Sequence, residues 1–150
     1  MNKLLEAAGE KVPRGLEDEL QNIFDMPLFD LIGLKVEKAG KGRCELSLGL
    51  AKEGSRQGEM MHGGITMFAL DNAASMAVMT VNGGVSQSTL ELKVNFLAPA
   101  SKPPFRAQGE VIKIGRSTAV AEARLLDAGD KVCAMALGTW FIMQSDSMKH

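Results

Sequence analysis

The segment over residues 61–79 carries the side chains best suited to chemistry. Its pattern predicts a helix that is apolar on nearly every side, is entered through Gly63 and Gly64, and has Asp71 in its middle. A helix that is hydrophobic all round is normally buried, and an ionised carboxylate is costly to bury without a partner. Asp71 therefore has either a structural counter-group or a chemical role.

The start of this helix offers a second reactive group. The first turn of a helix has unpaired N–H groups at the positive end of the helix dipole, and glycine lets a ligand approach that backbone closely. The Gly63 N–H is therefore suited to polarising a carbonyl and stabilising an oxyanion. A partly desolvated Asp71 carboxylate is suited to act as a general base on water or as a nucleophile. Together the two groups predict an enzyme.

The spacing of this pair constrains the assembly. Asp71 follows Gly63 by eight residues, which is about 12 Å along a helix that rises about 1.5 Å per residue. One substrate carbon cannot touch both groups within one chain. If they form a catalytic pair, each site takes Gly63 from one subunit and Asp71 from another, across a two-fold axis. The spacing thus predicts a homodimer at minimum.

Two neighbouring side chains extend the candidate site. Ser75 lies one turn after Asp71, where its hydroxyl would orient the carboxylate or a water molecule. His62 precedes the glycines, where it either contacts the substrate or fixes the turn. A structural role for Asp71 remains open, with Asn72, Ser75 or a donor from another subunit as its counter-group. The sequence has only two histidines and no cluster of metal ligands, so it predicts no metal site.

The elements that position these residues follow from the apolar pattern. Helical spacing predicts a first helix over 15–24, and the central helix extends to about Val81, where a glycine pair ends it. Strands are predicted over 33–37, 42–50, 86–96, 105–114, 117–126 and 131–143. Short connections favour antiparallel neighbours, so we expect an α+β fold with about six antiparallel strands and one long buried helix.

The last two predicted strands carry small residues on one face. These are Ala119, Ala121, Ala123, Ala134, Ala136 and Gly138. Small side chains there would let the helix lie close against the sheet. The opposite face of the last strand is also apolar, with Cys133, Met135, Leu137 and Phe141. One helix cannot cover both faces of a large sheet, so a second subunit is the expected cover.

Composition limits the remaining possibilities. The chain has 150 residues, enough for one domain, with 45% hydrophobic and 23% charged residues. Seventeen basic and eighteen acidic residues give a net charge of −1, so neither nucleic acid nor an anionic membrane is an expected partner. No apolar run has the length of a membrane span, and the N-terminus lacks a secretory pattern. Two cysteines outside any CxxC are expected to be buried thiols, and the cytoplasm is the expected location.

Three motifs resemble the PaaI-like branch of the hotdog-fold acyl-CoA thioesterases. They are His62-Gly63-Gly64, Leu70-Asp71-Asn72-Ala73 and Val94-Asn95-Phe96-Leu97-Ala98-Pro99, within a similarity that spans 27–143. The resemblance implies a single hotdog domain over 1–150, with 1–26 as an N-terminal helical extension. It also implies a sheet wrapped round the central helix, a homodimer and commonly a homotetramer. The implied reaction is hydrolysis of an acyl-CoA thioester, with coenzyme A entering only as part of the substrate.

The resemblance also implies roles for individual residues. Gly63 would supply the oxyanion amide, and Asp71 of the partner subunit would be the base or nucleophile. Thr89 falls where many relatives have a Ser or Thr that positions water, and Ser75 matches a hydroxyl used in some branches. Several relatives carry an Asn six residues before the histidine, whereas Arg56 stands there in this chain.

Candidates for substrate binding surround this pair. Their positions are Gly64, Gln57, Arg56, Met61, Met67 and Arg116. Gln57 stands beside Arg56 as a substitute for the missing Asn, and the methionines flank the site, although adaptable core filling is an alternative for them. The basic side chains either contact coenzyme A phosphates or are simply solvated. Two other functions stay open, namely a hydroxyacyl-thioester dehydratase that uses histidine as a base and a non-catalytic acyl-CoA-binding module.

Overall fold

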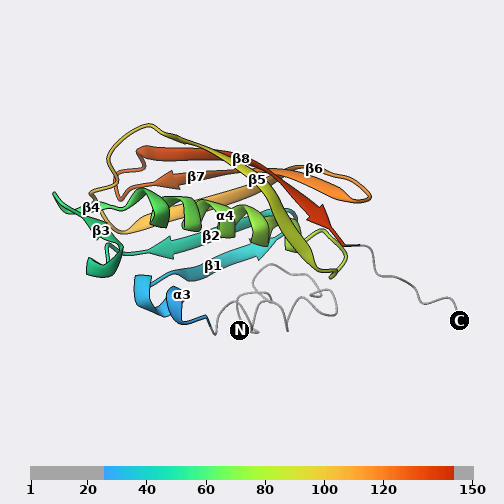
Figure 1. The fold of residues 1–150 in the computed structure, drawn as a ribbon, viewed down its shortest axis with the longest axis horizontal. Helices are drawn as coiled ribbons and strands as arrows, with labels where there is room; N and C mark the ends of the chain where they lie inside the picture. Colours follow the sequence, from blue (N-terminus) through green and yellow to red (C-terminus); the bar gives the residue numbers. More distant parts are fainter. Residues whose placement is uncertain (1–25, 144–150) are drawn as a thin grey trace, which may run out of the picture.

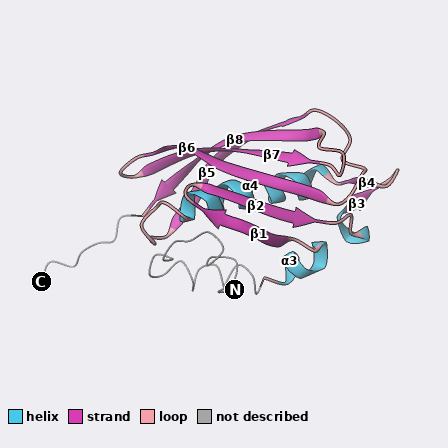
Figure 2. Ribbon diagram, turned by 180° about the vertical axis from the view of Figure 1, so that it is seen from behind, coloured by secondary structure: helices cyan, strands magenta, loops and turns pink. Residues whose placement is uncertain are grey.

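A six-stranded antiparallel sheet curves round one long helix in the computed structural model, which describes residues 26–143 (Figures 1 and 2). The helix is α4 (Gly63–Met79). The sheet has the order β1-β2-β6-β7-β8-β5. Its strands are β1 (Lys35–Gly40), β2 (Arg43–Leu48), β6 (Phe105–Ile114), β7 (Thr118–Leu126), β8 (Val132–Ile142) and β5 (Gln87–Phe96). The expected α+β fold, with a sheet wrapped round a central helix, is confirmed.

Several short elements were not predicted. Helix α3 (Pro27–Ile32) begins at Pro27, because proline is tolerated in the first turn of a helix, and ends at Gly33 with a φ of 65°. The polar stretch before α4 forms a 3-10 turn, η1 (Lys52–Gly54), and a two-stranded hairpin of β3 (Ser55–Arg56) and β4 (Met60–Met61). The predicted helix over 15–24 lies outside the described residues, so the N-terminal extension stays a prediction.

The small residues predicted to face the helix do so. Ala119, Ala121 and Ala123 of β7 are at most 1% exposed. Gly109 of β6 marks the closest contact, because a Cβ placed there would lie 2.2 Å from the carbonyl oxygen of Ala73 in α4. The helix backbone therefore rests directly on the sheet, with no side chain between them.

The prediction that α4 is buried on all sides is wrong for one face within this chain. Ala69, Leu70, Ala73 and Ala77 are fully buried against the sheet. Met67, by contrast, is 41% exposed, and the residues one turn before and after it along the same face are only half-buried. The sheet covers the helix from one side, which leaves a stripe of α4 without cover from the described residues. None of the helices in this part of the chain is long and apolar enough to cross a membrane.

The contact at Gly109 gives a stability prediction. Gly109→Ala is expected to lower the free energy of unfolding by about 3 kcal/mol or more, because the new methyl group meets backbone that cannot turn aside. Denaturant unfolding measures this. Gly49→Ala is the matched control, since a Cβ at Gly49 meets nothing within 4 Å. Equal stability of the two variants would contradict the close contact.

Candidate functional site

The candidate site lies on the open stripe of α4, beside the edge strand β5 (Figure 1). Gly63, Met67, Asp71 and Ser75 follow one another at intervals of four residues, so they lie along one face of the helix. None of the four is fully buried. The side chains and the N-terminal amide that the sequence singled out therefore share one accessible surface.

The Asp71 carboxyl is half-buried, and burial raises its pKa above the ordinary value of 3.8. The Thr89 hydroxyl of β5 donates a hydrogen bond of 3.0 Å to Asp71 Oδ1, which partly offsets that rise in the pKa. No basic side chain among residues 26–143 forms an ion pair with Asp71. The carboxylate is thus partly desolvated and has no cation paired with it in the described part of the chain, which makes it a stronger base than an exposed one.

Asn72 and Ser75, two of the expected structural counter-groups, form no hydrogen bond with the Asp71 carboxylate among the described residues. The Asn72 side-chain amide donates to the Phe68 carbonyl oxygen at 2.8 Å. The Ser75 hydroxyl accepts a hydrogen bond of 2.7 Å from the indole N–H of Trp140. Thr89 alone of the residues that the sequence placed at this site bonds to the carboxylate.

A β-bulge in β5 directs Thr89 toward α4. Thr89 pairs with Trp140 of β8, whereas Glu91 pairs with Thr139, so Leu90 is the extra residue. Side chains two residues apart on a regular strand point to the same side. Here Thr89 donates a hydrogen bond to Asp71, whereas Glu91 accepts one from Thr139. Thr139 lies on the opposite face of β8 from the buried Trp140. The bulge thus reverses the alternation and brings a hydroxyl to the carboxylate.

The start of α4 distinguishes the two glycines. His62 is the N-cap, and its Nδ1 accepts a hydrogen bond of 3.0 Å from the Gly64 N–H. This bond fixes the turn, and contact of His62 with a substrate stays a prediction. The Gly63 N–H has no partner among the described residues. Gly63, and not Gly64, presents the free amide that an oxyanion requires, with the Phe96 ring packed beside it.

The other predicted residues lie in three places. Arg56 and Gln57 are exposed on the β3–β4 hairpin that leads into α4. Met61 is 6% exposed and belongs to the hydrophobic core, which was the alternative interpretation for it. Met67 is on the open stripe. Arg116 lies in the β6–β7 turn, at the opposite end of the sheet from Gly63. Thr118, two residues after Arg116, pairs with Phe141 at one end of β8. Phe96, whose ring packs beside Gly63, pairs with Ala134 near the other end of β8.

Trp140 was missed by the sequence analysis. It is fully buried on β8, and its position continues the inward-facing series Ala134, Ala136 and Gly138. That alternation was visible in the sequence and would have placed the indole against the helix. Its hydrogen bond to Ser75 depends on the crossing of α4 and β8, which no local pattern encodes.

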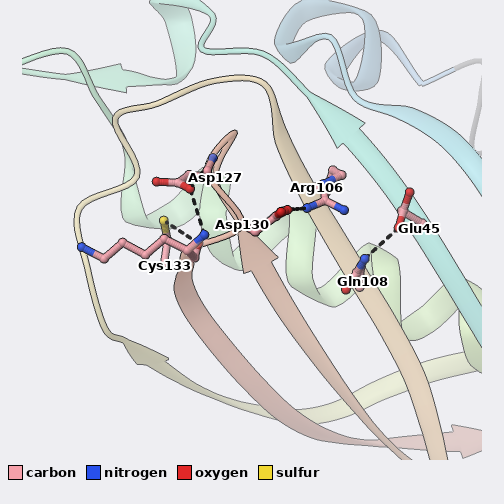
Figure 3. Close-up of polar contacts among 8 residues, drawn as sticks. Glu45, Arg106, Gln108, Asp127, Asp130 and Cys133 are labelled. Atoms are coloured by element: carbon pink, nitrogen blue, oxygen red, sulfur yellow. Dashed lines mark hydrogen bonds and ion pairs between the residues drawn. The ribbon is translucent and has the colours of Figure 1, made fainter.

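Several charged side chains pair with one another away from this stripe. Arg43 pairs with Glu110 at 2.7 Å. Gln108 donates to Glu45, and Arg106 pairs with Asp130 (Figure 3). A hollow of about 770 Å³ over β1, β2, β6 and β7 is lined by such residues and does not include Asp71. Within residues 26–143 no group of three acidic, histidine or cysteine side chains is arranged to hold a metal ion.

Comparisons with known proteins find a matching family, related sequences and a similar structure. Residues 58–134 match the family model described as "Thioesterase superfamily". A Saccharolobus solfataricus protein whose name reads "Putative esterase" is 38% identical over 118 residues, which are 79% of this chain and 84% of that one. The 1,4-dihydroxy-2-naphthoyl-CoA hydrolase of Listeria monocytogenes is 27% identical over 74% of this chain and 91% of its own. The structure of the Escherichia coli PaaI protein superposes with a TM-score of 0.76 over 89% and 97% of the two chains at 15% identity.

The raised pKa of Asp71 predicts how stability depends on pH. A carboxyl whose pKa is higher in the folded protein than in the unfolded chain lowers stability as pH rises through that folded pKa. Asp71→Ala is therefore expected to be at least as stable as the wild type at pH 7, where the variant no longer buries a charge. This advantage shrinks as pH falls from the raised pKa of the folded protein toward 3.8, the ordinary pKa, and is absent below it, because the wild-type carboxyl is then neutral in both states.

Asp127 supplies the matched control for this measurement. It is 4% exposed, and its Oδ1 accepts from the backbone N–H groups of Gly129 at 2.9 Å and Lys131 at 3.0 Å (Figure 3). Asp127→Ala is expected to lose about 2 kcal/mol of unfolding free energy with these bonds. Denaturant unfolding at both pH values compares the two variants. A loss at Asp71 as large as that at Asp127 would identify Asp71 as a structural acid.

Proposed function

The chain belongs to the thioesterase superfamily, and we propose that it hydrolyses an acyl-CoA thioester to coenzyme A and a carboxylic acid. The hotdog fold expected from the His62-Gly63-Gly64 motif is confirmed by the likeness to the PaaI structure. The observation that carries the proposal is the Asp71 carboxylate, which is half-buried, has a raised pKa and receives the Thr89 hydroxyl. The Listeria relative, named for a CoA thioester, supports coenzyme A as the leaving group.

The proposed mechanism divides the work between two subunits. The Gly63 N–H of one subunit polarises the thioester carbonyl and stabilises the oxyanion that forms there. Asp71 of the partner subunit acts on the carbonyl carbon, as a base that takes a proton from attacking water or as the nucleophile itself. Collapse of the tetrahedral intermediate breaks the C–S bond. On the general-base route, coenzyme A leaves as the thiol with the proton that Asp71 took from water. On the nucleophilic route, the thiolate takes a proton from solvent and leaves an acyl–Asp71 anhydride, which water then hydrolyses to the carboxylic acid.

Two surfaces of the chain support a homodimer. The ten-residue strand β5 lies at the edge of the sheet, so one of its sides has no strand partner among the described residues. The open stripe of α4 lies beside that edge. Two β5 strands paired antiparallel about a two-fold axis would bring the two open stripes together, covering Met67 and surrounding each Asp71 with the partner's helix start. A homotetramer would further cover Leu137 and Phe141, which are 47% and 41% exposed on β8.

The same arrangement suggests places for the substrate. Met67 lies between Gly63 and Asp71 on the stripe and would contact the acyl group. In an antiparallel pair, the sheet end that carries Arg116 lies near the partner's helix start, where the phosphates of coenzyme A would meet a cation. Arg56 and Gln57 reach the same region from the hairpin that precedes α4.

The dehydratase alternative fits the site less well. That reaction needs an imidazole nitrogen as a base. Here Nδ1 of His62 accepts the Gly64 N–H, so the neutral ring carries its proton on Nε2. The ring would have to give up the helix cap before it could take a proton.

Activity of Asp71 variants tests the proposal directly. Thiol release from a panel of aryl, short-, medium- and long-chain acyl-CoAs is expected for the wild type. Asp71→Asn is expected to lower kcat by about 10²- to 10⁴-fold, as for loss of a general base. Glu91→Gln is the matched control, because Glu91 lies on β5, the strand that carries Thr89, but bonds to Thr139 and not to Asp71; its kcat is expected to be unchanged. Unchanged turnover in Asp71→Asn would remove this residue from its role, and binding without hydrolysis would favour the binding module.

Mixed dimers test the division between subunits. Gly63→Pro deletes the amide with little disturbance, since proline suits the first helical position and His62 has the extended ψ of 137° that precedes a proline. Each variant by itself, Gly63→Pro or Asp71→Asn, is expected to turn over substrate more slowly than the wild type. Refolded together in equal amounts, they are expected to regain about a quarter of wild-type activity, because half the dimers then contain one intact site of two. Gly63→Ala keeps the amide and is the control; no regain would place both groups in one chain.

A further inference from the structure

Trp140 lies directly behind the proposed site. It is 0% exposed on β8, it is the cross-strand neighbour of Thr89, and its indole N–H donates to Ser75 Oγ at 2.7 Å. A Cβ added at Gly138 would lie 2.8 Å from the edge of the indole ring, so the ring occupies a space that only glycine leaves. One buried side chain is therefore adjacent to both hydroxyls that flank Asp71.

Ser75 is held from two strands at once. The Gln87 side chain of β5 donates to the Ser75 backbone carbonyl at 2.8 Å, and Trp140 of β8 donates to its hydroxyl oxygen. The position of the Ser75 hydroxyl therefore does not depend on the helix alone.

The chemistry of these donors sets the direction of the Ser75 proton. An indole N–H can only donate, so it occupies a lone pair of the Ser75 oxygen and leaves the hydroxyl proton for another acceptor. Ser75 and Asp71 are one turn apart, which places their Cβ atoms about 5–6 Å from each other on the same face. That gap suits one water molecule, which would accept from Ser75 and donate to the Asp71 carboxylate.

We propose that Trp140 is a positioning residue, which fixes the Ser75 hydroxyl as a donor to the water molecule that Asp71 activates. The water keeps one lone pair for the thioester carbon while it gives a proton to Asp71. This inference rests on the proposed hydrolytic function and selects the general-base route within it. Trp140 touches neither substrate nor the reacting atoms and acts only through Ser75.

A double-mutant cycle tests this dependence. Trp140→Phe keeps an aromatic ring but removes the donor, and is expected to lower kcat about tenfold with KM within about twofold, as for loss of a hydrogen bond. In a Ser75→Ala background, the same change is expected to alter kcat by less than about twofold, because the hydroxyl that Trp140 positions is gone. An equal loss in both backgrounds, or no loss in either, would overturn the proposal.

Trp140 is the only tryptophan, so its indole gives a readout that does not depend on activity. A single indole N–H signal is expected in a ¹H–¹⁵N spectrum, and Ser75→Ala is expected to move it upfield through loss of the hydrogen bond. Thr80→Val, at the C-cap of the same helix, is the matched control. It removes part-buried hydrogen bonds with Gly42 and Ala77, so it is expected to lower stability but to leave kcat and the indole signal unchanged. An indole signal that ignores Ser75→Ala would contradict the bond.

The outcomes separate this inference from the proposed function. If the wild type hydrolyses acyl-CoA and Asp71→Asn does not, but Trp140→Phe acts independently of Ser75, then only the positioning role fails. If the wild type releases no thiol from any acyl-CoA, or Asp71→Asn retains full turnover, the proposed function itself fails and the positioning role fails with it.

Discussion

The backbone of α4 lies on strand β6 at Gly109, where even a methyl group would overlap the Ala73 carbonyl oxygen. This contact sets the depth of the helix in the sheet. It also requires small residues on the neighbouring strands, and the buried alanines of β7 and β8 meet that requirement. Because the helix sits so deep on one side, the sheet can curve until its edge strand β5 reaches the middle of α4. The hydrogen bond from Thr89 to Asp71 is a consequence of that depth.

The carboxylate of Asp71 contrasts with the other acids of this part of the chain. Exposed pairs such as Arg43–Glu110 lie on the outer face of the sheet, where ion pairs contribute little to stability. Asp127 is more deeply buried, but two backbone N–H groups bind it. Asp71 accepts a hydrogen bond from one hydroxyl and pairs with no cation among the described residues, so the desolvation of its charge opposes its burial. A group held at such a cost is typical of a site that performs chemistry.

The open stripe of α4 connects the desolvation of Asp71 with the proposed association of two chains. A helix with apolar residues on every side is stable in water only when every side is covered. The sheet of one chain covers α4 incompletely, and the uncovered residues include both proposed catalytic groups. The stripe that would drive association is thus the stripe that bears Gly63 and Asp71, so a complete site and a covered helix would arise in the same event.

The sequence by itself determined the strands, the central helix and its glycine entrance, because alternation, helical spacing and turn residues are local properties. The small-residue face of β7 and β8 followed from the same alternation. Tertiary structure alone decided which neighbour each side chain meets. Thr89 reaches Asp71 through the bulge at Leu90, Ser75 is bound by Trp140, and Gly64 is capped by His62 while Gly63 stays free. The pattern of a segment encodes which of its faces is buried, but the partner on that face depends on how distant segments cross, and the periodicity of one segment carries no record of that crossing.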